Sequence, residues 1–247
     1  MSEAIIKTEN LTRTFGNFIA VDNITFDVKP GEIFGFLGAN GAGKTTAMKM
    51  LTGLLKPSSG KALVSGKDVY TETEGIKKSI GYMSQKFSLY DDLTVDENIR
   101  FYGGIYGIPH AELSHKVSRV VDSVGLNEVR KKLVASLPLG WKQKLAFSIS
   151  ILHNPAIVFL DEPTGGVDPI TRRQFWESIY EASNNGITVF VTTHYMDEAE
   201  YCDRVSIMVD GKIEALDTPD GLRQTYSTQS IEEVFITLAR SAKRGGT

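Results

Sequence analysis

The chain alternates between short apolar runs and longer stretches in which apolar residues recur at helical spacing. Apolar or alternating runs between turn residues predict strands. These runs are Ala4–Thr8, Phe18–Val28, Glu32–Leu37, Lys61–Val64, Ser79–Met83, Ala156–Leu160, Gly186–Thr192, Val205–Val209 and Lys212–Leu216. Only Asp210-Gly211 separates the last two, and this dipeptide is typical of tight turns. The pattern therefore predicts strands toward both ends of the chain and a hairpin at Asp210.

Helical spacing dominates the middle of the chain. The ranges that show it are Val95–Tyr106, Glu112–Val124, Leu139–Leu152, Ile170–Ser183 and Ser230–Ala239. Thr94 precedes the first of them, and Glu97 stands where the partner in a capping box would be. The first three follow one another without an intervening strand, so the pattern predicts a helical subdomain over about residues 86–154. The end of the chain, residues 217–247, is expected to be a short helical tail that frays at residues 243–247.

Composition excludes some function classes without selecting one. Hydrophobic residues make up 41% of the 247 residues and charged residues 23%, which is ordinary for a globular protein. The formal net charge of −3 gives no broad attraction to nucleic acid, so no nucleic-acid partner is expected. Neither a signal peptide at Met1-Ser2-Glu3-Ala4 nor a membrane-spanning run is expected. Cys202, the single cysteine, fits a reducing compartment and the role of core filler.

The strongest chemical motif is the segment Gly38–Thr45, which fits the phosphate-binding P-loop. It follows the apolar run Ile33–Leu37 and leads into the helix-compatible segment Thr46–Leu51. Glycines let successive N–H groups point at phosphate oxygens, and the helix adds the positive end of its dipole. Lys44 can then reach the β- and γ-phosphates, and the Thr45 hydroxyl can ligate Mg²⁺. The alternative is an ordinary glycine-rich turn. The residues expected to line the phosphate site are Gly38, Ala39, Asn40, Gly41, Ala42, Gly43, Lys44, Thr45 and Thr46.

Two acids follow the apolar run Ile157–Leu160. A buried strand delivers a carboxylate to the carboxyl edge of a sheet, where open α/β sheets bind their ligands. Asp161 is there positioned to help hold Mg²⁺, and Glu162 could polarise the water that attacks the γ-phosphate. The alternative is that both acids only cap the following helix. The Pro163-Thr164 turn and the upstream P-loop favour the functional interpretation, and the chain is expected to have an α/β fold with a P-loop NTPase core.

The order of these motifs resembles the ATP-binding subunit of ABC transporters over nearly the whole chain. Phe15, in Thr14-Phe15-Gly16, matches the aromatic residue that stacks on adenine in that family. Gln85 matches the glutamine that links Mg²⁺ and the attacking water to the membrane partner. Asp168 matches the D-loop, and His194 matches the histidine that contacts the γ-phosphate. Taken singly, each match is more typical of a packed or solvated residue, and their order around two strong motifs carries the resemblance. The roles that it implies are catalysis by Glu162, His194 and Gln85, Mg²⁺ ligation by Thr45, Gln85 and Asp161, and ATP contacts by Phe15 and Asp168.

One segment departs from the family pattern. The signature sequence L-S-G-G-Q falls on residues 137–141, which read Leu-Pro-Leu-Gly-Trp and are called the signature segment below. In the family this segment opens a helix that faces the γ-phosphate bound by the opposite subunit. Pro138 replaces the serine hydroxyl and Leu139 replaces one glycine, whereas Gly140 remains. Proline suits the first turn of a helix, so Pro138 and Gly140 are still expected to contact ATP.

The resemblance implies an ABC ATPase domain over residues 1–247, with an N-terminal antiparallel β region and the helical subdomain inside it. It implies ATP and Mg²⁺ as cofactors and a second ATPase subunit, identical or not, that completes a sandwich dimer. Transmembrane permease subunits on other chains would place this one peripherally on the cytoplasmic side of the cell membrane. The tail at residues 230–235 is similar to that of drug and polysaccharide exporters. The candidates for the permease contact are Phe87, Leu89, Tyr90, Phe101, Tyr102 and Tyr106, of which about half are expected to be core instead.

Two other functions stay open at the level of the sequence. A soluble ABC-type ATPase could act on DNA, ribosomes or cofactor assembly. A DNA-repair member would need a long coiled-coil insertion and a translation factor would usually carry two cassettes, and the sequence shows neither. A regulatory nucleotide-binding module with little turnover is suggested only by the altered signature segment. A hydrolysis assay would separate this module from the enzymes.

Overall fold

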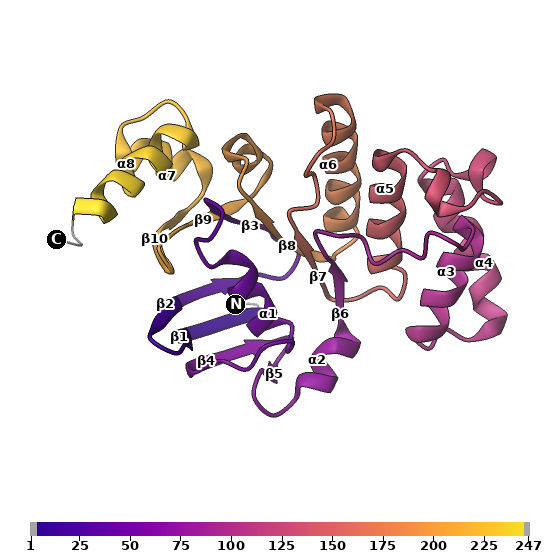
Figure 1. Ribbon diagram of the computed structural model, residues 1–247, viewed down its shortest axis with the longest axis horizontal. Coiled ribbons are helices and arrows are strands. Elements are labelled where there is room, and N and C mark those ends of the chain that lie inside the picture. Colours follow the sequence, from indigo (N-terminus) through magenta and orange to yellow (C-terminus); the bar gives the residue numbers. More distant parts are fainter. Residues whose placement is uncertain (1–3, 245–247) are drawn as a thin grey trace.

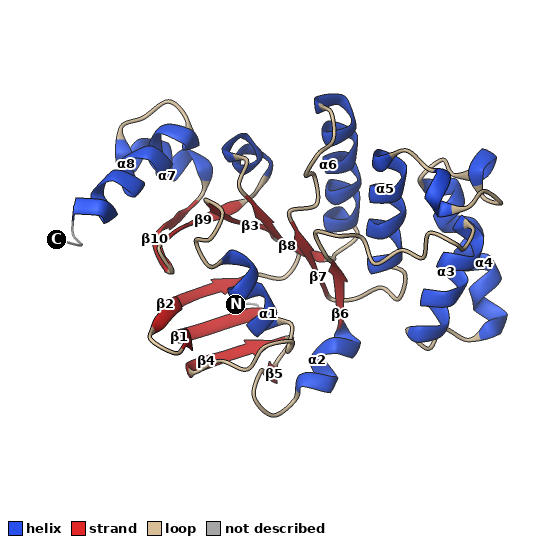
Figure 2. Ribbon diagram, in the orientation of Figure 1, coloured by secondary structure: helices blue, strands red, loops and turns tan. Residues whose placement is uncertain are grey.

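Two β-sheets of different character organise the chain (Figure 2). The structure is a computed structural model and describes residues 4–244. Its strands are β1 (Ile6–Phe15), β2 (Phe18–Val28), β3 (Ile33–Gly38), β4 (Ser59–Val64), β5 (Lys67–Asp68), β6 (Ile80–Met83), β7 (Ile157–Asp161), β8 (Thr188–Thr193), β9 (Arg204–Val209) and β10 (Lys212–Asp217). The four-stranded sheet has the order β2-β1-β4-β5 and is antiparallel. The six-stranded sheet has the order β10-β9-β3-β8-β7-β6, and only its β9–β10 edge hairpin is antiparallel.

The parallel strands are apolar because both faces of their sheet are covered. β3, for example, is buried along its whole length. Phe34 and Phe36 pack on one face with α1 and the antiparallel sheet, whereas Ile33 and Leu37 pack on the other face with later helices. This alternation places one hydrophobic core on each side of the large sheet.

Helices pack on the large sheet and also form a separate group to one side of it (Figure 1). They are α1 (Lys44–Leu51), α2 (Thr73–Ser79), α3 (Val95–Ile105), α4 (His110–Ser123), α5 (Leu139–Ser150), α6 (Pro169–Asn184), α7 (Pro219–Tyr226) and α8 (Ile231–Arg244). Short 3₁₀ turns lie at Asn127–Val129, Val134–Ser136 and Met196–Tyr201. Buried residues of α3, α4 and α5 form a third hydrophobic cluster, separate from the two around the sheet. This cluster supports the proposed helical subdomain over residues 86–154.

The α/β fold with a P-loop core and an antiparallel β region is confirmed. The capping box at the start of α3 is also confirmed: the Thr94 hydroxyl accepts from the Glu97 N–H at 3.2 Å, and the Glu97 carboxylate accepts from the Thr94 N–H at 2.8 Å. No helix within residues 4–244 has the length and hydropathy needed to cross a bilayer.

Some element boundaries differ from the expectation for a physical reason. The first strand does not end at Thr8 but continues to Phe15, because a bulge at Asn10, whose φ is 51°, shifts the register and lets the strand resume. Helix α2 was missed since Ile76 is its only buried residue, which leaves no periodic signal. Helix α7 lies within the helical tail expected at residues 217–247, but it was not expected as a separate helix, although Thr218 and Pro219 form a recognisable helix start. Residues 1–3 and 245–247, on which expectations about the two ends rested, lie outside the described residues.

Candidate active site

The expected chemical groups meet at the carboxyl ends of four neighbouring parallel strands. β3 leads into the P-loop at Gly38, β7 ends at Asp161, β8 is followed by His194, and β6 is followed closely by Gln85. These strands are adjacent in the order β3-β8-β7-β6. Residues far apart in the sequence are therefore brought to one edge of the sheet, where α/β folds bind ligands.

The P-loop turns tightly between β3 and α1. Gly43 is the residue before the helix and has a φ of 105°, a left-handed conformation that favours glycine. A Cβ atom at this position would overlap the carbonyl oxygen of Ala20 in β2. Gly43 is therefore required by conformation and by space, and the first N–H groups of α1 stay open toward the loop.

Lys44 is the best-buried cation of the site, with a residue exposure of 4%. Its ammonium donates to the carbonyl oxygens of Gly38 at 2.8 Å and Ala39 at 3.1 Å, and lies 3.6 Å from Oε1 of Glu162. Burial lowers the pKa of Lys44, and the nearby Glu162 and Asp161 oppose that shift. The ammonium is thus held inside the loop at the place where phosphates would bind.

Asp161 receives two hydroxyl hydrogen bonds on the same oxygen. Thr192 in β8 donates to Oδ1 at 2.7 Å and Thr45 in α1 donates at 3.3 Å. Carboxylate and hydroxyl oxygens are the donors that Mg²⁺ prefers, so the residues present fit this ion. Within residues 4–244 no group of three or more His, Cys, Asp and Glu side chains could hold a metal alone. A bound Mg²⁺ would therefore take further oxygens from the substrate and water.

Glu162 is the centre of the site. Its backbone has a φ of 48°, which is rare for a residue with a side chain and typical of functional positions. Nδ1 of His194 lies 3.0 Å from Oε2, and Nε2 of Gln85 donates to the same oxygen at 3.1 Å. Because an ionised carboxylate can only accept, the hydrogen of this contact belongs to Nδ1 of His194. Glu162 is thus oriented by Gln85 and His194 and faces Lys44.

Thr192 is a site residue that the sequence analysis missed. It is fully buried, and besides holding Asp161 it accepts the Glu162 N–H on both its carbonyl and its hydroxyl oxygen, each at 3.1 Å. These bonds fix the unusual backbone turn at Glu162. The available signal was a pair of hydroxyl residues, Thr192 and Thr193, between the apolar run Val189–Val191 and His194.

Phe15 lies at the end of β1, with 47% of its surface exposed. One face of its ring is covered by the Arg13 guanidinium, whose carbon lies 4.5 Å from the ring centroid. An exposed aromatic ring held from behind is suited to stacking on a flat base. Contact of Phe15 with adenine stays a prediction.

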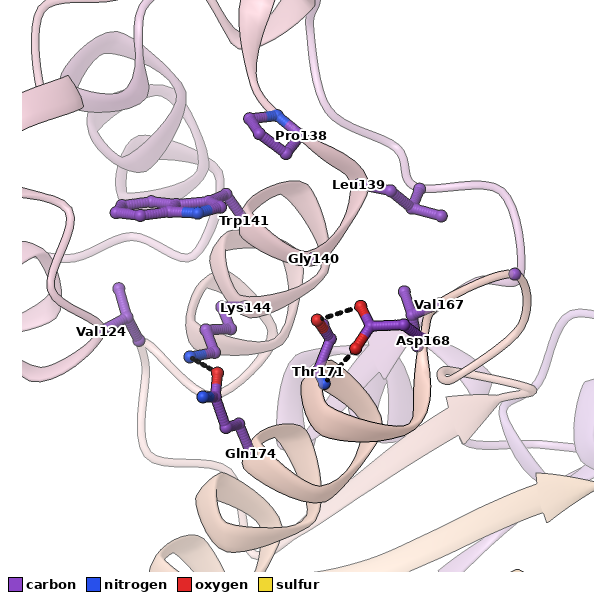
Figure 3. A pocket seen from close by; sticks show the side chains of 11 residues that line it. Val124, Pro138, Leu139, Gly140, Trp141, Lys144, Val167, Asp168, Thr171 and Gln174 are labelled. Atoms are coloured by element: carbon purple, nitrogen blue, oxygen red, sulfur yellow. Dashed lines mark hydrogen bonds between the residues drawn. The ribbon is translucent and has the colours of Figure 1, made fainter.

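The signature segment forms a second group, next to the start of α6 (Figure 3). Pro138 is the residue before α5, and a cavity of about 360 Å³ is lined by Pro138, Gly140, Trp141, Asp168 and Thr171 among others. The Asp168 carboxylate caps α6 by accepting from the N–H groups of Ile170 and Thr171, both at 3.0 Å, and from the Thr171 hydroxyl at 2.5 Å. Its side chain is therefore committed to the helix start, and its contact with ATP stays a prediction.

The structure thus brings the expected residues together in two groups. Lys44, Thr45, Gln85, Asp161, Glu162 and His194 share one site through direct contacts. Pro138, Gly140 and Asp168 share the second group, and buried Gln143 of α5 ties this helix to the first site through a hydrogen bond to the Pro163 carbonyl. A site divided in this way within one chain fits nucleotide contacts made by two copies.

Comparison with known proteins decides between the P-loop families. The model of the ABC transporter family matches residues 21–165, which is more than half of the chain. The chain belongs to the ABC transporter ATP-binding family. The matched residues include the P-loop and the two acids Asp161 and Glu162.

Two curated relatives and one solved structure extend the match along this ABC chain. It is 48% identical over 241 residues to the "Probable multidrug ABC transporter ATP-binding protein YbhF" of Escherichia coli (strain K12), covering 96% of this chain and 42% of that protein. It is 35% identical over 246 residues to the "Linearmycin resistance ATP-binding protein LnrL" of Bacillus subtilis (strain 168), covering 96% of this chain and 79% of that protein. A structure described as the "ATP binding subunit of ABC transporter" superposes with a TM-score of 0.85 at 27% identity, over 95% of this chain and 99% of the other. The ABC chain therefore spans less than half the length of its E. coli relative.

Proposed function

We propose that this chain binds and hydrolyses ATP as the ATPase subunit of an ABC exporter, with transmembrane subunits on other chains. The observation that carries the proposal is the set of contacts around Glu162, where Gln85 and His194 hold one carboxylate oxygen and Lys44 faces the other. Such an arrangement suits a general base that is oriented by two donors. Family membership supports ATP as the nucleotide.

The residues of the site have separable roles in this proposal. The P-loop N–H groups and Lys44 bind the phosphates, and Phe15 stacks on adenine. Thr45 and Asp161 would hold Mg²⁺, assisted by Gln85, and the ion when bound neutralises charge on the phosphates. When the Lys44 ammonium turns to phosphate oxygens, Oε1 of Glu162 becomes free to accept a hydrogen from the attacking water.

His194 has two nitrogens available for different tasks. Nδ1 donates to Glu162, so Nε2 is left to face the γ-phosphate side of the site. This geometry and the family membership support the proposed roles of Glu162, His194 and Gln85. The Glu162→Gln variant tests the first of these roles.

The altered signature segment has a proposed role in a dimer of this chain. We infer that the start of α5 from one copy faces ATP held by the P-loop of a second copy, as in the sandwich dimers of the family. The start of a helix offers free N–H groups to a phosphate even without the serine hydroxyl. Association with permease subunits on the cytoplasmic side of the membrane is proposed because the E. coli and B. subtilis relatives carry transporter and resistance names.

Hydrolysis and transport can be tested in one experiment. Phosphate release from ATP is measured for the chain alone and for the chain assembled with its permease subunits in proteoliposomes. The proposal expects Mg²⁺-dependent hydrolysis and ATP-dependent movement of a drug-like substrate away from the ATP side. Hydrolysis without transport in the assembled complex favours a soluble ABC-type ATPase. Nucleotide binding without any hydrolysis favours a regulatory module.

A further inference from the structure

Arg172 makes several contacts that the proposed chemistry does not use. It lies in the first turns of α6, and its side chain has 18% of its surface exposed. The guanidinium carbon lies 4.2 Å above the centroid of the Tyr195 ring, which directly follows His194. One terminal nitrogen lies 3.3 Å from the carboxylate of Asp197, and Nε lies 3.7 Å from that of Glu198. One cation of α6 therefore contacts three residues of the segment that follows His194.

Tyr195 contacts both Arg172 and His194. The two rings have centroids 4.2 Å apart and planes inclined by 34°, so they pack on each other. Arg172 lies over the Tyr195 ring, and His194 reaches Glu162 at 3.0 Å. A continuous series of contacts therefore leads from α6 to the carboxylate at the centre of the site.

The last of the residues that Arg172 contacts, Glu198, has a buried carboxylate. Glu198 has no exposed surface and accepts a hydrogen bond from the Thr164 hydroxyl, in the turn after Glu162. Burial raises the pKa of Glu198, and hydrogen bonds together with the Arg172 charge oppose the rise. Arg172 and Thr164 thus hold the residues after His194 from two sides, one on α6 and one beside Glu162.

We propose that Arg172 is a positioning residue that keeps His194 against Glu162 by clamping residues 195–198. The guanidinium is planar, so it can stack on Tyr195 and pair with the two carboxylates at the same time. Since α6 begins directly after Asp168, beside the signature segment, the clamp also links the orientation of His194 to the start of α6. The inference rests on the proposed function, because it assigns Arg172 to the same reaction.

A purely structural role is the competing explanation. Arg172 could serve only to neutralise the buried Glu198, since a buried charge without a partner is costly. Removal of Arg172 would then lower stability and change nothing specific at His194. The two roles predict different results for Arg172→Lys. Lysine keeps the positive charge, but it has no planar group that can stack on Tyr195.

The test is a double-mutant cycle on ATP turnover. Arg172→Met is expected to lower kcat by about 10- to 100-fold, as small displacements of a catalytic group do, while the dissociation constant for ATP stays within about twofold of wild type. In a His194→Ala background the same change is expected to alter kcat by no more than about twofold. Independent, additive losses in the double variant would overturn the proposal. Arg173→Met is the matched control, because Arg173 is the next residue and its side chain is 81% exposed.

Two further variants keep the proposal testable if Arg172→Met folds poorly. Tyr195→Leu leaves the pairing of Arg172 with Glu198 intact and removes the ring between Arg172 and His194, so it should reproduce the loss of kcat without a change in melting temperature. Arg172→Lys should recover stability and only part of kcat. Full recovery of kcat by lysine, or normal turnover in Tyr195→Leu, would show that the charge alone matters and would contradict the clamp.

A measurement without turnover separates this inference from the proposed function. In ¹⁵N-labelled protein, the His194 imidazole signals should report one nitrogen hydrogen-bonded to a carboxylate. Arg172→Met should weaken that signature, and Arg173→Met should preserve it. An unchanged His194 signal in Arg172→Met overturns the inference even where hydrolysis is normal. A wild type that binds but never hydrolyses ATP contradicts the proposed function and leaves this spectroscopic result to decide the clamp.

Discussion

Nδ1 of His194 lies 3.0 Å from Oε2 of Glu162, although the two residues follow different strands of the large sheet. The backbone prepares this contact, because the Glu162 N–H is bound to Thr192, two residues before His194. One strand therefore fixes both partners of the hydrogen bond. Such a pair supports general-base chemistry, in which the position of the carboxylate must be constant before substrate arrives.

Glu162→Gln tests the base directly. An amide has the same shape but cannot take up a proton, so ATP affinity should persist while hydrolysis falls by about 10²- to 10⁴-fold. An ATP-bound dimer should then accumulate, which light scattering can detect. Glu181→Gln on the exposed side of α6 is the control. Hydrolysis at the wild-type rate in Glu162→Gln would remove Glu162 from the role of base.

Much of the site could be predicted because its residues occur in local motifs. The P-loop glycines, Lys44 and the two acids at the end of β7 are recognisable from the elements around them. Thr192 could not be found in this way, since its importance arises from hydrogen bonds to Asp161 and Glu162 on a neighbouring strand. The contacts of Arg172 were hidden for the same reason, because α6 and residues 195–198 meet only in three dimensions.

Secondary-structure elements were likewise predictable only where the sequence has a local pattern. Strands and helices with strong periodicity were located well, as β2 and α3 illustrate. The bulge at Asn10, which lets β1 continue past Thr8, depends on pairing with β2 and β4 and has no local pattern. Helix α2 buries only Ile76, so its sequence carries no apolar periodicity by which the helix could be located.

Gly43→Ala should abolish nucleotide binding through the backbone. Alanine in the left-handed conformation costs roughly 1–2 kcal/mol, and its Cβ would overlap the Ala20 carbonyl oxygen. We expect lower stability in urea unfolding and loss of binding of a fluorescent ATP analogue. Gly104→Ala in α3 is the matched control, since open space surrounds that position, and it should raise stability by about 0.5–1 kcal/mol. Normal ATP binding by Gly43→Ala would show that the loop need not keep its present shape.

ATP affinity should fall at alkaline pH because of Lys44. Burial lowers the pKa of Lys44 in the free chain, and bound phosphates would raise it, so the bound state holds more protons than the free state. By linkage, affinity is fully present below the pKa of the free chain and declines as pH rises toward the pKa of the complex. Titrations with ATP over an alkaline pH series measure this decline. In Lys44→Arg, which does not titrate in this range, affinity should be lower but independent of pH. A decline equal to that of wild type in Lys44→Arg would assign it to another group.

Side-chain exposure reduces the number of candidates for the proposed permease contact. Tyr90 and Phe101 are 44% and 42% exposed and touch edge to face, with centroids 4.7 Å apart. Ile105, in the same helix as Phe101, is 61% exposed and was missed in the sequence analysis. Phe87 and Leu89 are instead partly buried against the hydrophobic clusters. These positions support a docking surface on α3 and the segment before it.

Glutamate at Tyr90, Phe101 and Ile105 together should therefore release the chain from its permease subunits. A charged group buried in an apolar interface without a partner is strongly unfavourable, whereas ATP binding should be unchanged. Co-purification from membranes reports the loss. Leu54→Glu, at a 55% exposed apolar residue outside this surface, is the control. Retained co-purification of the triple variant would place the contact elsewhere.

Pro138→Ser tests whether the altered signature segment faces ATP in a dimer. Pro138 has no side-chain cap bond at the start of α5, and a serine there would add a hydroxyl that can bond to phosphate in trans. A hydrogen bond to a charged group is worth about 1.5–3 kcal/mol, which corresponds to a rate gain of about ten- to hundredfold if it acts wholly in the transition state. Part of this gain can be offset, because proline also fixes the helix start.

Pro138→Ala separates the hydroxyl from the loss of the ring. If turnover of the assembled transporter rises in Pro138→Ser and not in Pro138→Ala, the hydroxyl reaches the nucleotide of the opposite copy. If both variants behave alike, the change acts only on the helix start, and the trans contact is contradicted. Gly140→Asp would not decide this question, because a Cβ atom on Gly140 would lie 2.5 Å from Cγ2 of Thr171 and disturb the start of α6 in any case. The serine and alanine pair avoids that steric damage, since both replace a residue whose side chain makes no cap bond.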